Sequence, residues 1–191
     1  MSAILLTPPA LEPVSLADAK HFLRVEHDDD DDVIAALIAG ARVHVEAQTR
    51  RALIAQAWRL TRDVWPARGA LPILPVPLVA VTAVAVYRAD GTMQTVDVDT
   101  FHIDKISAPA ILAFERGALP VPGRLAAGIE IDIDVGYGAA AQDVPQPLRQ
   151  VIGRASITVN IATPDADSFR RSEIYLTGQI ARAVARGQRG L

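Results

Sequence analysis

The chain has 191 residues, a formal net charge of −3, and a composition that is 50% hydrophobic but only 5% aromatic. A chain of this length can bury a core as one domain, and its small negative charge by itself predicts no nucleic-acid partner. It contains no cysteine, which excludes disulfides, thiol catalysis and cysteine–zinc sites.

Charge is distributed unevenly between the two ends. Residues 1–35 contain eight acidic residues against two basic ones, a net charge of −6, whereas residues 170–191 contain five arginines against Glu173, a net charge of +4. Contact between the acidic end of one copy and the basic end of the next, or docking of the basic end on an acidic partner, is therefore electrostatically favourable.

We expect neither a signal peptide nor a membrane span. The first residues contain no basic region of the kind that opens a signal peptide. Residues 69–87 are nineteen uncharged residues, long enough to cross a bilayer, but Pro72, Pro75 and Pro77 would interrupt a helix there.

The first elements of the chain are predicted to be helical. Residues 1–14 should be extended and irregular because they contain Pro8, Pro9 and Pro13. Ser15 is a good N-cap and, with Asp18, approximates a capping box, so we predict a helix over about residues 15–25.

Five consecutive aspartates at 28–32 allow two interpretations. A calcium loop would need a glycine at the position of Val33 and a bidentate glutamate at that of Ala39. The interpretation that remains is an acidic N-terminus, favoured by the helix dipole, for a helix over about residues 31–52. Its inner stripe is predicted to consist of Ile34, Leu37, Ile38, Ala41, Val45 and Gln48. On its outer side, Arg42, Glu46 and Arg50 are spaced for ion pairs.

Residues 57–135 form a predicted antiparallel β region. Apolar and polar residues alternate along several short segments, and Asp90-Gly91 is a hairpin signature. Residues 79–87 are apolar on both faces, which favours a covered strand. The last segment, 129–135, alternates strictly between apolar and acidic residues, as a strand with one buried and one solvated face does.

A glycine turn then leads into a second helical region. Pro145 and Pro147 suit the start of a helix, and apolar spacing predicts helices over about 147–161 and 165–186. The predicted fold class is α+β: a small helical bundle with an inserted antiparallel β region. The predicted organisation is one domain over 1–163, with a helical core of 11–56 and 144–163 and a β insertion of 57–138, followed by a basic segment at 164–191.

The sequence predicts no enzyme activity, cofactor site or metal site. Residues 136–141 match a G-x-G-x-x-A dinucleotide motif, but Asp143, Pro145 and Pro147 start the helix too late for it to hold a phosphate. Glu130, Asp132 and Asp134 share a strand face, where they could ligate a metal or act as acid and base. We favour an acidic surface that faces solvent or a lumen and does not bind DNA.

A resemblance to a known family rests on the order and spacing of several segments, which together cover about residues 11–160. They are PVSLADAKHFLRV at 13–25, the acidic run leading into VIAALI at 33–38, VEAQTRRAL at 45–53, LPVPL at 74–78, ADGT at 89–92, VGYG at 135–138 and VPQPLRQ at 144–150. In this order the chain resembles the head–tail connector, or adaptor, proteins of tailed phages and of phage-derived gene transfer agents, in their longer variety with a β insertion.

This resemblance implies a structural protein of the virion neck, assembled in the bacterial cytoplasm. Similar adaptors form a ring under the portal, expected to be a dodecamer, which extends the DNA channel and docks a stopper or tail terminator. DNA would pass through without sequence-specific binding. Relatives place a C-terminal segment against the portal protein, a role that would fall here on Phe169, Arg170, Arg171, Leu176, Ile180, Arg182, Arg186 and Arg189. Two alternatives remain: a small soluble metal- or ligand-binding enzyme domain, or another neck protein such as a stopper or tail-completion protein.

Overall fold

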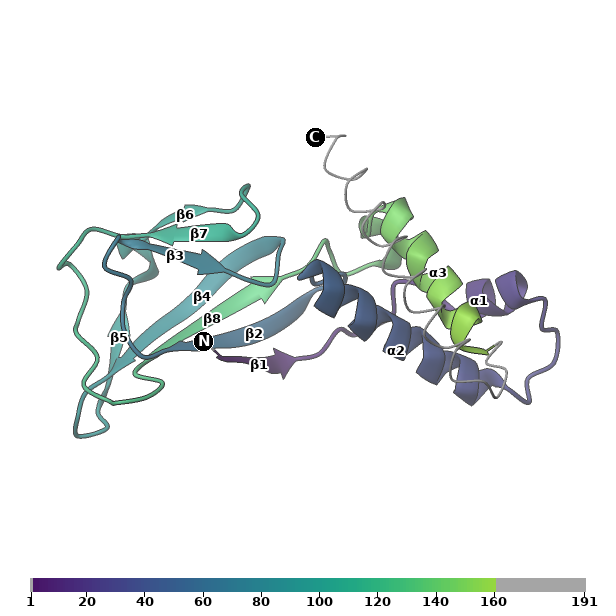
Figure 1. The fold of residues 1–191 in the computed structure, drawn as a ribbon, viewed down its shortest axis with the longest axis horizontal. Coiled ribbons are helices and arrows are strands. Elements are labelled where there is room, and N and C mark those ends of the chain that lie inside the picture. The colour runs from purple at the N-terminus through teal and green to yellow at the C-terminus, as the bar shows by residue number, and fades with distance from the viewer. Residues whose placement is uncertain (1, 161–191) are drawn as a thin grey trace, which may run out of the picture. The chain divides into compact units, whose positions relative to one another are not determined.

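The computed structural model describes the backbone of residues 2–160 and the side chains of residues 2–153. Within it the chain separates into two compact units. One comprises residues 1–9 and 55–137 and holds all the described strands; the other comprises residues 10–54 and the described residues from 138 onward (Figure 1). The α+β class is confirmed, whereas the predicted helix over 165–186 lies outside the described residues.

The β unit is built on a five-stranded antiparallel sheet in the order β1-β2-β8-β4-β5. Its strands are β1 (Ser2–Thr7), β2 (Gln56–Arg62), β8 (Ile129–Val135), β4 (Leu78–Tyr87) and β5 (Met93–Val96). The sequence-distant strands β2, β8 and β4 lie side by side at its centre, where β8 pairs along its whole length with both neighbours. A second sheet has the order β3-β7-β6, with β3 (Ala70–Ile73), β7 (Ala110–Ala113) and β6 (His102–Asp104).

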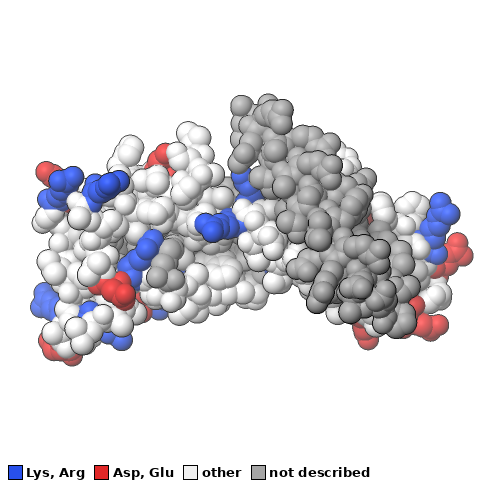
Figure 2. All heavy atoms as spheres, viewed as in Figure 1, with Lys and Arg blue, Asp and Glu red and all other residues white. Residues whose placement is uncertain are grey.

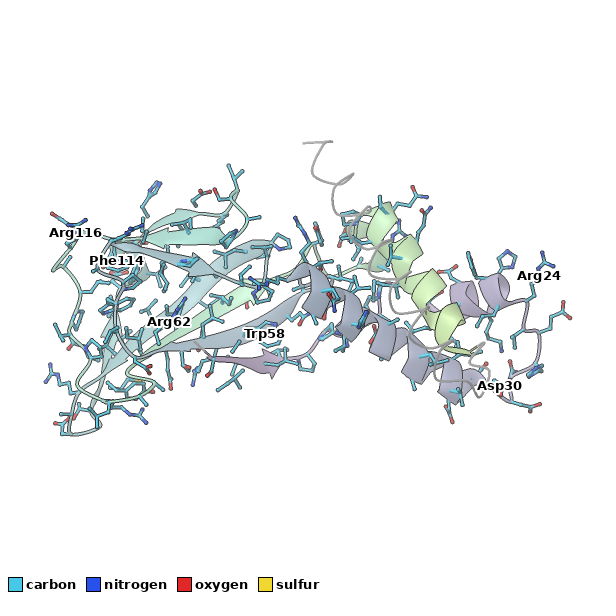
Figure 3. All side chains as sticks on the ribbon, in the orientation of Figure 1. Arg24, Asp30, Trp58, Arg62, Phe114 and Arg116 are labelled. Atoms are coloured by element: carbon cyan, nitrogen blue, oxygen red, sulfur yellow. The ribbon has the colours of Figure 1, made fainter. Side chains whose placement is uncertain are left out.

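Alternate side chains of both sheets form the buried core of this unit. On β8, Ile129, Ile131 and Ile133 are fully buried, and on the second sheet Leu71 and Leu112 are 1% and 0% exposed. Beside the sheets Trp65, Phe101 and Phe114 form an aromatic cluster, with ring centroids 5.3 to 6.0 Å apart. Phe114, labelled in Figure 3, directly follows β7.

Several sequence expectations for this unit need correction. Residues 2–7 are a regular strand, not irregular chain, because the prolines begin only at position 8. β4 is not covered on both faces: Val79 is 51% exposed, at the first of two register shifts against β8.

The Asp90-Gly91 hairpin is confirmed, with Gly91 at φ 83° and its N–H donating to the Arg88 carbonyl.

The helical unit contains α1 (Leu16–Leu23), α2 (Asp31–Thr49) and α3 (Gln146–Asn160). Ala19, Ile34 and Ile38 form a buried cluster between α1 and α2. α1 and α2 end two to three residues earlier than predicted. Arg24 and Arg50 adopt the left-handed conformation there (φ 59° and 54°), and each donates its N–H back into the preceding turn. That conformation terminates a helix, although neither residue is the glycine that usually signals it.

The polar contacts of the helical unit also refine the predictions. The Ser15 N-cap is confirmed: its hydroxyl accepts from the Asp18 N–H at 3.0 Å. The Asp18 carboxylate accepts from the Ser15 hydroxyl at 2.7 Å and not from the backbone N–H that a full capping box uses. The Arg42–Glu46 pair forms at 2.8 Å, but both side chains are largely buried and Arg42 also binds Glu12, so the pair is not on an outer face. Gln48, predicted for the inner stripe, is exposed.

The aspartate run lies at the N-terminus of α2, as predicted. Asp30 is the N-cap residue, although its side chain makes no capping hydrogen bond. Lys20 of α1 reaches across to Asp28 and Asp31 at 2.5 and 2.6 Å. These contacts raise the pKa of Lys20, chiefly through the hydrogen bond to Asp28, and the same hydrogen bond lowers the pKa of Asp28. The aspartate run therefore also links α1 to α2 through Lys20. Among the described helices, none is long and apolar enough to cross a membrane.

Candidate functional site on the five-stranded sheet

The row of three acids on β8 lies on one face of the sheet. Glu130, Asp132 and Asp134 alternate with residues that are at most 1% exposed, so the acids lie on the face opposite the core. The period-two pattern of the sequence is thus confirmed in the structure. Mixed positive and negative side chains are visible on the β unit in Figure 2.

The two strands beside β8 supply very different neighbours for these acids. On β2, the directly opposite residues are Thr61, Arg59 and Ala57. On β4 they are Ala85, Ala83 and Ala80. Opposite residues of an antiparallel pair project from the same face. Directly opposite the acids there is therefore an arginine on the β2 side and only alanines on the β4 side.

Arg59 holds the centre of the acid row. Its Nε and Nη2 donate to the two carboxylate oxygens of Asp132 at 2.7 and 2.8 Å, and its Nη1 lies 3.2 Å from Glu130. A bidentate arginine–carboxylate pair is among the strongest side-chain interactions. The hydrogen bond to Asp132 is the largest cause of a raised pKa at Arg59. The side chains of Glu130 and Asp132 are each only 18% exposed.

Tyr87 extends this network beyond β8. Its hydroxyl donates to Glu130 at 2.9 Å, and the guanidinium carbon of Arg124 lies 4.8 Å from its ring centroid. The hydrogen bond to Glu130, followed by burial, raises the pKa of the Tyr87 hydroxyl. The Tyr87 carbonyl also accepts from the Gly123 N–H, and an added Cβ on Gly123 would meet the Ala89 nitrogen, so the chain at Gly123 lies close against this end of the sheet.

Asp134 differs from the other two acids. It lies between Ala57 of β2 and Ala80 of β4. Within the described part of the chain its carboxylate makes no hydrogen bond and no ion pair. The row therefore consists of two acids that contact Arg59, whose single positive charge balances one of them, and a third acid without an ion pair at the end of the strand.

This arrangement does not suit the metal or acid–base chemistry considered for the acids. Both oxygens of Asp132 are already bound by a guanidinium, and Glu130 is held by Arg59 and Tyr87. Within the described residues, no group of three or more histidine, aspartate or glutamate side chains could hold a metal ion. The geometry is that of a structural polar network on a sheet surface.

The sequence did not indicate Arg59 and Tyr87 as partners of the acids, nor Arg124 as a partner of Tyr87. Arg59 is 73 residues from Asp132 along the chain. Arg59 falls within the predicted β region, but neither segment's sequence indicates that β2 pairs with β8 or in which register. The candidate docking residues, from Phe169 to Arg189, lie outside the described residues.

Comparisons with known proteins agree with the resemblance seen in the sequence. Residues 13–98 match the family model described as phage gp6-like head–tail connector protein. No curated protein matched the sequence. The resemblance to head–tail connectors is thus confirmed for these residues.

Three solved structures have a similar fold. A chain in the neck of an empty GTA particle computed with C6 symmetry matches with a TM-score of 0.76 and 21% identity, over 87% of each chain. A chain in the virion of a native gene transfer agent particle matches with a TM-score of 0.74 and 21% identity, over 87% of this chain and 88% of that one. A chain in the neck of a native GTA particle computed with C12 symmetry matches with a TM-score of 0.66 and 22% identity, over 85% and 86%.

Proposed function

We propose that this chain, with its head–tail connector segment at residues 13–98, is a structural head-to-tail adaptor of a tailed-phage-like particle. It forms a ring under the portal, extends the DNA channel and docks the tail or a stopper. The observation that carries the proposal is the family match, and a fold shared with chains of GTA necks over nearly nine-tenths of both lengths supports it. It works in the virion neck after assembly in the bacterial cytoplasm.

Each part of the chain has a place in this proposal. The domain of residues 1–163 is the body of the ring subunit, and residues 164–191 are the segment that docks on the portal. Five arginines against one acid in residues 170–191 give that segment a charge suited to an acidic surface. The row formed by Glu130, Asp132 and Asp134 faces solvent or the lumen, where carboxylates do not attract the phosphates of passing DNA.

The site offers no support for an enzyme as the alternative. An enzyme needs a nucleophile, a base or a metal centre at the place where substrate binds. Here Glu130 and Asp132 are held by Arg59 and Tyr87, and the β4 residues directly opposite the three acids are alanines. The second alternative, a stopper or tail-completion protein, can be distinguished from an adaptor by its position along the neck.

Electron microscopy of particles made with and without the chain tests the function. Cells that lack the chain should produce heads with a portal but without tails, and the full-length chain supplied in trans should restore tailed particles. In the restored neck, a ring of this chain should lie directly against the portal. Tailed particles formed without the chain would contradict the proposal, and a ring one level further from the head would identify a stopper instead.

A further inference from the structure

The five-stranded sheet has two open edges. Of the described strands, β1 pairs only with β2, and β5 pairs only with β4. Each outer edge therefore presents a row of backbone N–H and C=O groups to whatever lies beside it.

Neither edge strand carries the usual protection against pairing with another chain. Soluble proteins place lysine, other charges or proline on such strands. β1 reads SAILLT and β5 reads MQTV, without a charge or a proline in either. Ile4, Leu5 and Leu6 of β1 are 51%, 42% and 44% exposed, and Met93 of β5 is 57% exposed. These apolar side chains beside open backbone groups indicate that both edges are covered in the working assembly.

The two edges also match in length and direction. A register shift between Leu5 and Thr7 leaves Ser2–Leu5 as the regular stretch of β1, and β5 has four residues. All four pairings across the sheet are antiparallel. Direction therefore reverses four times from β1 to β5, and the two edge strands run the same way. When copies are related by rotation about a ring axis, β5 of one copy meets β1 of the next in parallel orientation.

We propose that β1 of each copy pairs in parallel with β5 of its neighbour, so that one mixed sheet continues around the ring. This inference rests on the proposed ring-forming function and names the interface that builds the ring. A second copy is the occupant because one head-to-tail contact covers both edges of every subunit, and such heterologous contacts close into rings. An extended segment of another protein would cover one edge and leave the other open.

The absence of cysteine from the chain allows a direct cross-linking test, since the only thiols of the chain are those introduced. Ile4 is opposite Arg59 on β2, and Thr95 is opposite Ala85 on β4, so both project from the face that carries Asp132 and Glu130. Leu5 is opposite Trp58 and projects from the other face. In a continuous sheet, neighbouring strands are about 4.8 Å apart, within reach of a disulfide only for side chains on the same face.

The experiment oxidises particles that contain the full-length variant Ile4→Cys/Thr95→Cys, with Ser2→Cys/Thr95→Cys covering the register shifted by two residues. One of these two double variants should give a ladder of disulfide-linked multimers, up to the number of subunits in the ring, that disappears on reduction. The matched control Leu5→Cys/Thr95→Cys and each single variant should give no such ladder. Dimers from Ile4→Cys alone would show β1–β1 pairing and overturn the proposal. If rings are visible in the neck but neither double variant gives a ladder of multimers, the edge-pairing proposal is overturned while the adaptor function stands. If particles contain the chain but no ring, both the edge pairing and the adaptor function are overturned.

A second variant removes an edge donor without introducing a thiol. Arg88 and Thr92 are hydrogen-bonded across the hairpin, so the alternation of the antiparallel ladder places the Thr95 N–H on the outer edge. Thr95→Pro should therefore keep the sheet folded but lower incorporation into particles about tenfold, since each ring contact loses a backbone hydrogen bond. Thr95→Val, which keeps the N–H, should incorporate normally. Equal incorporation of the two folded variants would contradict edge pairing.

Discussion

At the scale of single residues, Asp132 and Asp134 are a natural pair for comparison. They occupy the same face of the same strand, but Asp132 is bound at both oxygens by Arg59, whereas Asp134 lies between two alanines. We expect Asp132→Asn to lower the free energy of unfolding by about 1–2 kcal/mol, because a partly buried charged hydrogen-bond pair is lost. Asp134→Asn should change it by less than about 0.5 kcal/mol. Urea denaturation measures both; equal effects would show that the Arg59 contact contributes nothing specific.

Tyr87 provides a test of the same network through pH. Its pKa is raised by the hydrogen bond to Glu130 and by burial, so the neutral hydroxyl stabilises the fold. That contribution is complete below the ordinary tyrosine pKa of about 10 and is lost as pH rises through the higher folded value. The tyrosinate absorbance of the wild type minus that of Tyr87→Phe should therefore show a midpoint above about 10. A midpoint at the ordinary value would mean that the hydroxyl is not held by Glu130 in solution.

At the scale of elements, the two N-terminal helices begin with different kinds of cap. Ser15 makes a capping hydrogen bond at the start of α1, whereas Asp30 at the start of α2 makes none with its side chain. Ser15→Ala should cost about 1 kcal/mol, the usual value for a lost cap. Asp30→Ala should cost less, because it removes a charge near the helix dipole and a 3.9 Å contact with the His27 ring but no capping hydrogen bond. Loss of helical circular dichroism in urea measures the two variants, and a larger cost at Asp30 would contradict the caps described here.

The strands show how far local patterns predict an element. Strict alternation in residues 129–135 predicted both the strand and its buried face, since each side chain in a strand has a fixed side. The same reasoning failed at residues 2–7. Those residues have no polar alternation, because β1 is exposed on both faces, and the nearby prolines suggested irregular chain. An edge strand is held by its backbone partner, and that partner cannot be identified from its own side chains.

At the scale of the whole molecule, the opposite charges of the two ends lead to a prediction about attachment. Deleting residues 170–191 should abolish binding to portal-bearing heads while leaving the circular dichroism of the remaining chain unchanged. A full-length variant with glutamine at positions 170, 171, 182, 186 and 189 tests whether charge or length matters. If charge dominates, this variant should bind as weakly as the deletion, and wild-type binding should weaken with added salt. A truncated chain that still joins heads would show that the portal contact lies elsewhere.

The sequence by itself determined most elements and the α+β fold class. Caps, hairpin residues and apolar periods are local, so they predicted α1, α2, α3, the β4–β5 hairpin and β8 close to their observed bounds. The order of short segments was enough to indicate a resemblance to head–tail connectors, and residues 13–98 match the model of that family.

Only the tertiary structure decided which segments meet. It brought Arg59 to Asp132 across 73 residues, placed alanines on the other side of the acid row, and left β1 and β5 as open edges running in the same direction. Strand order and register arise from backbone hydrogen bonds between distant segments, and any extended segment can form them. Side-chain patterns depend on residues that are close in the sequence, so the sequence predicts the elements. Strand pairing depends on residues that are far apart in the sequence, so only the tertiary structure shows it.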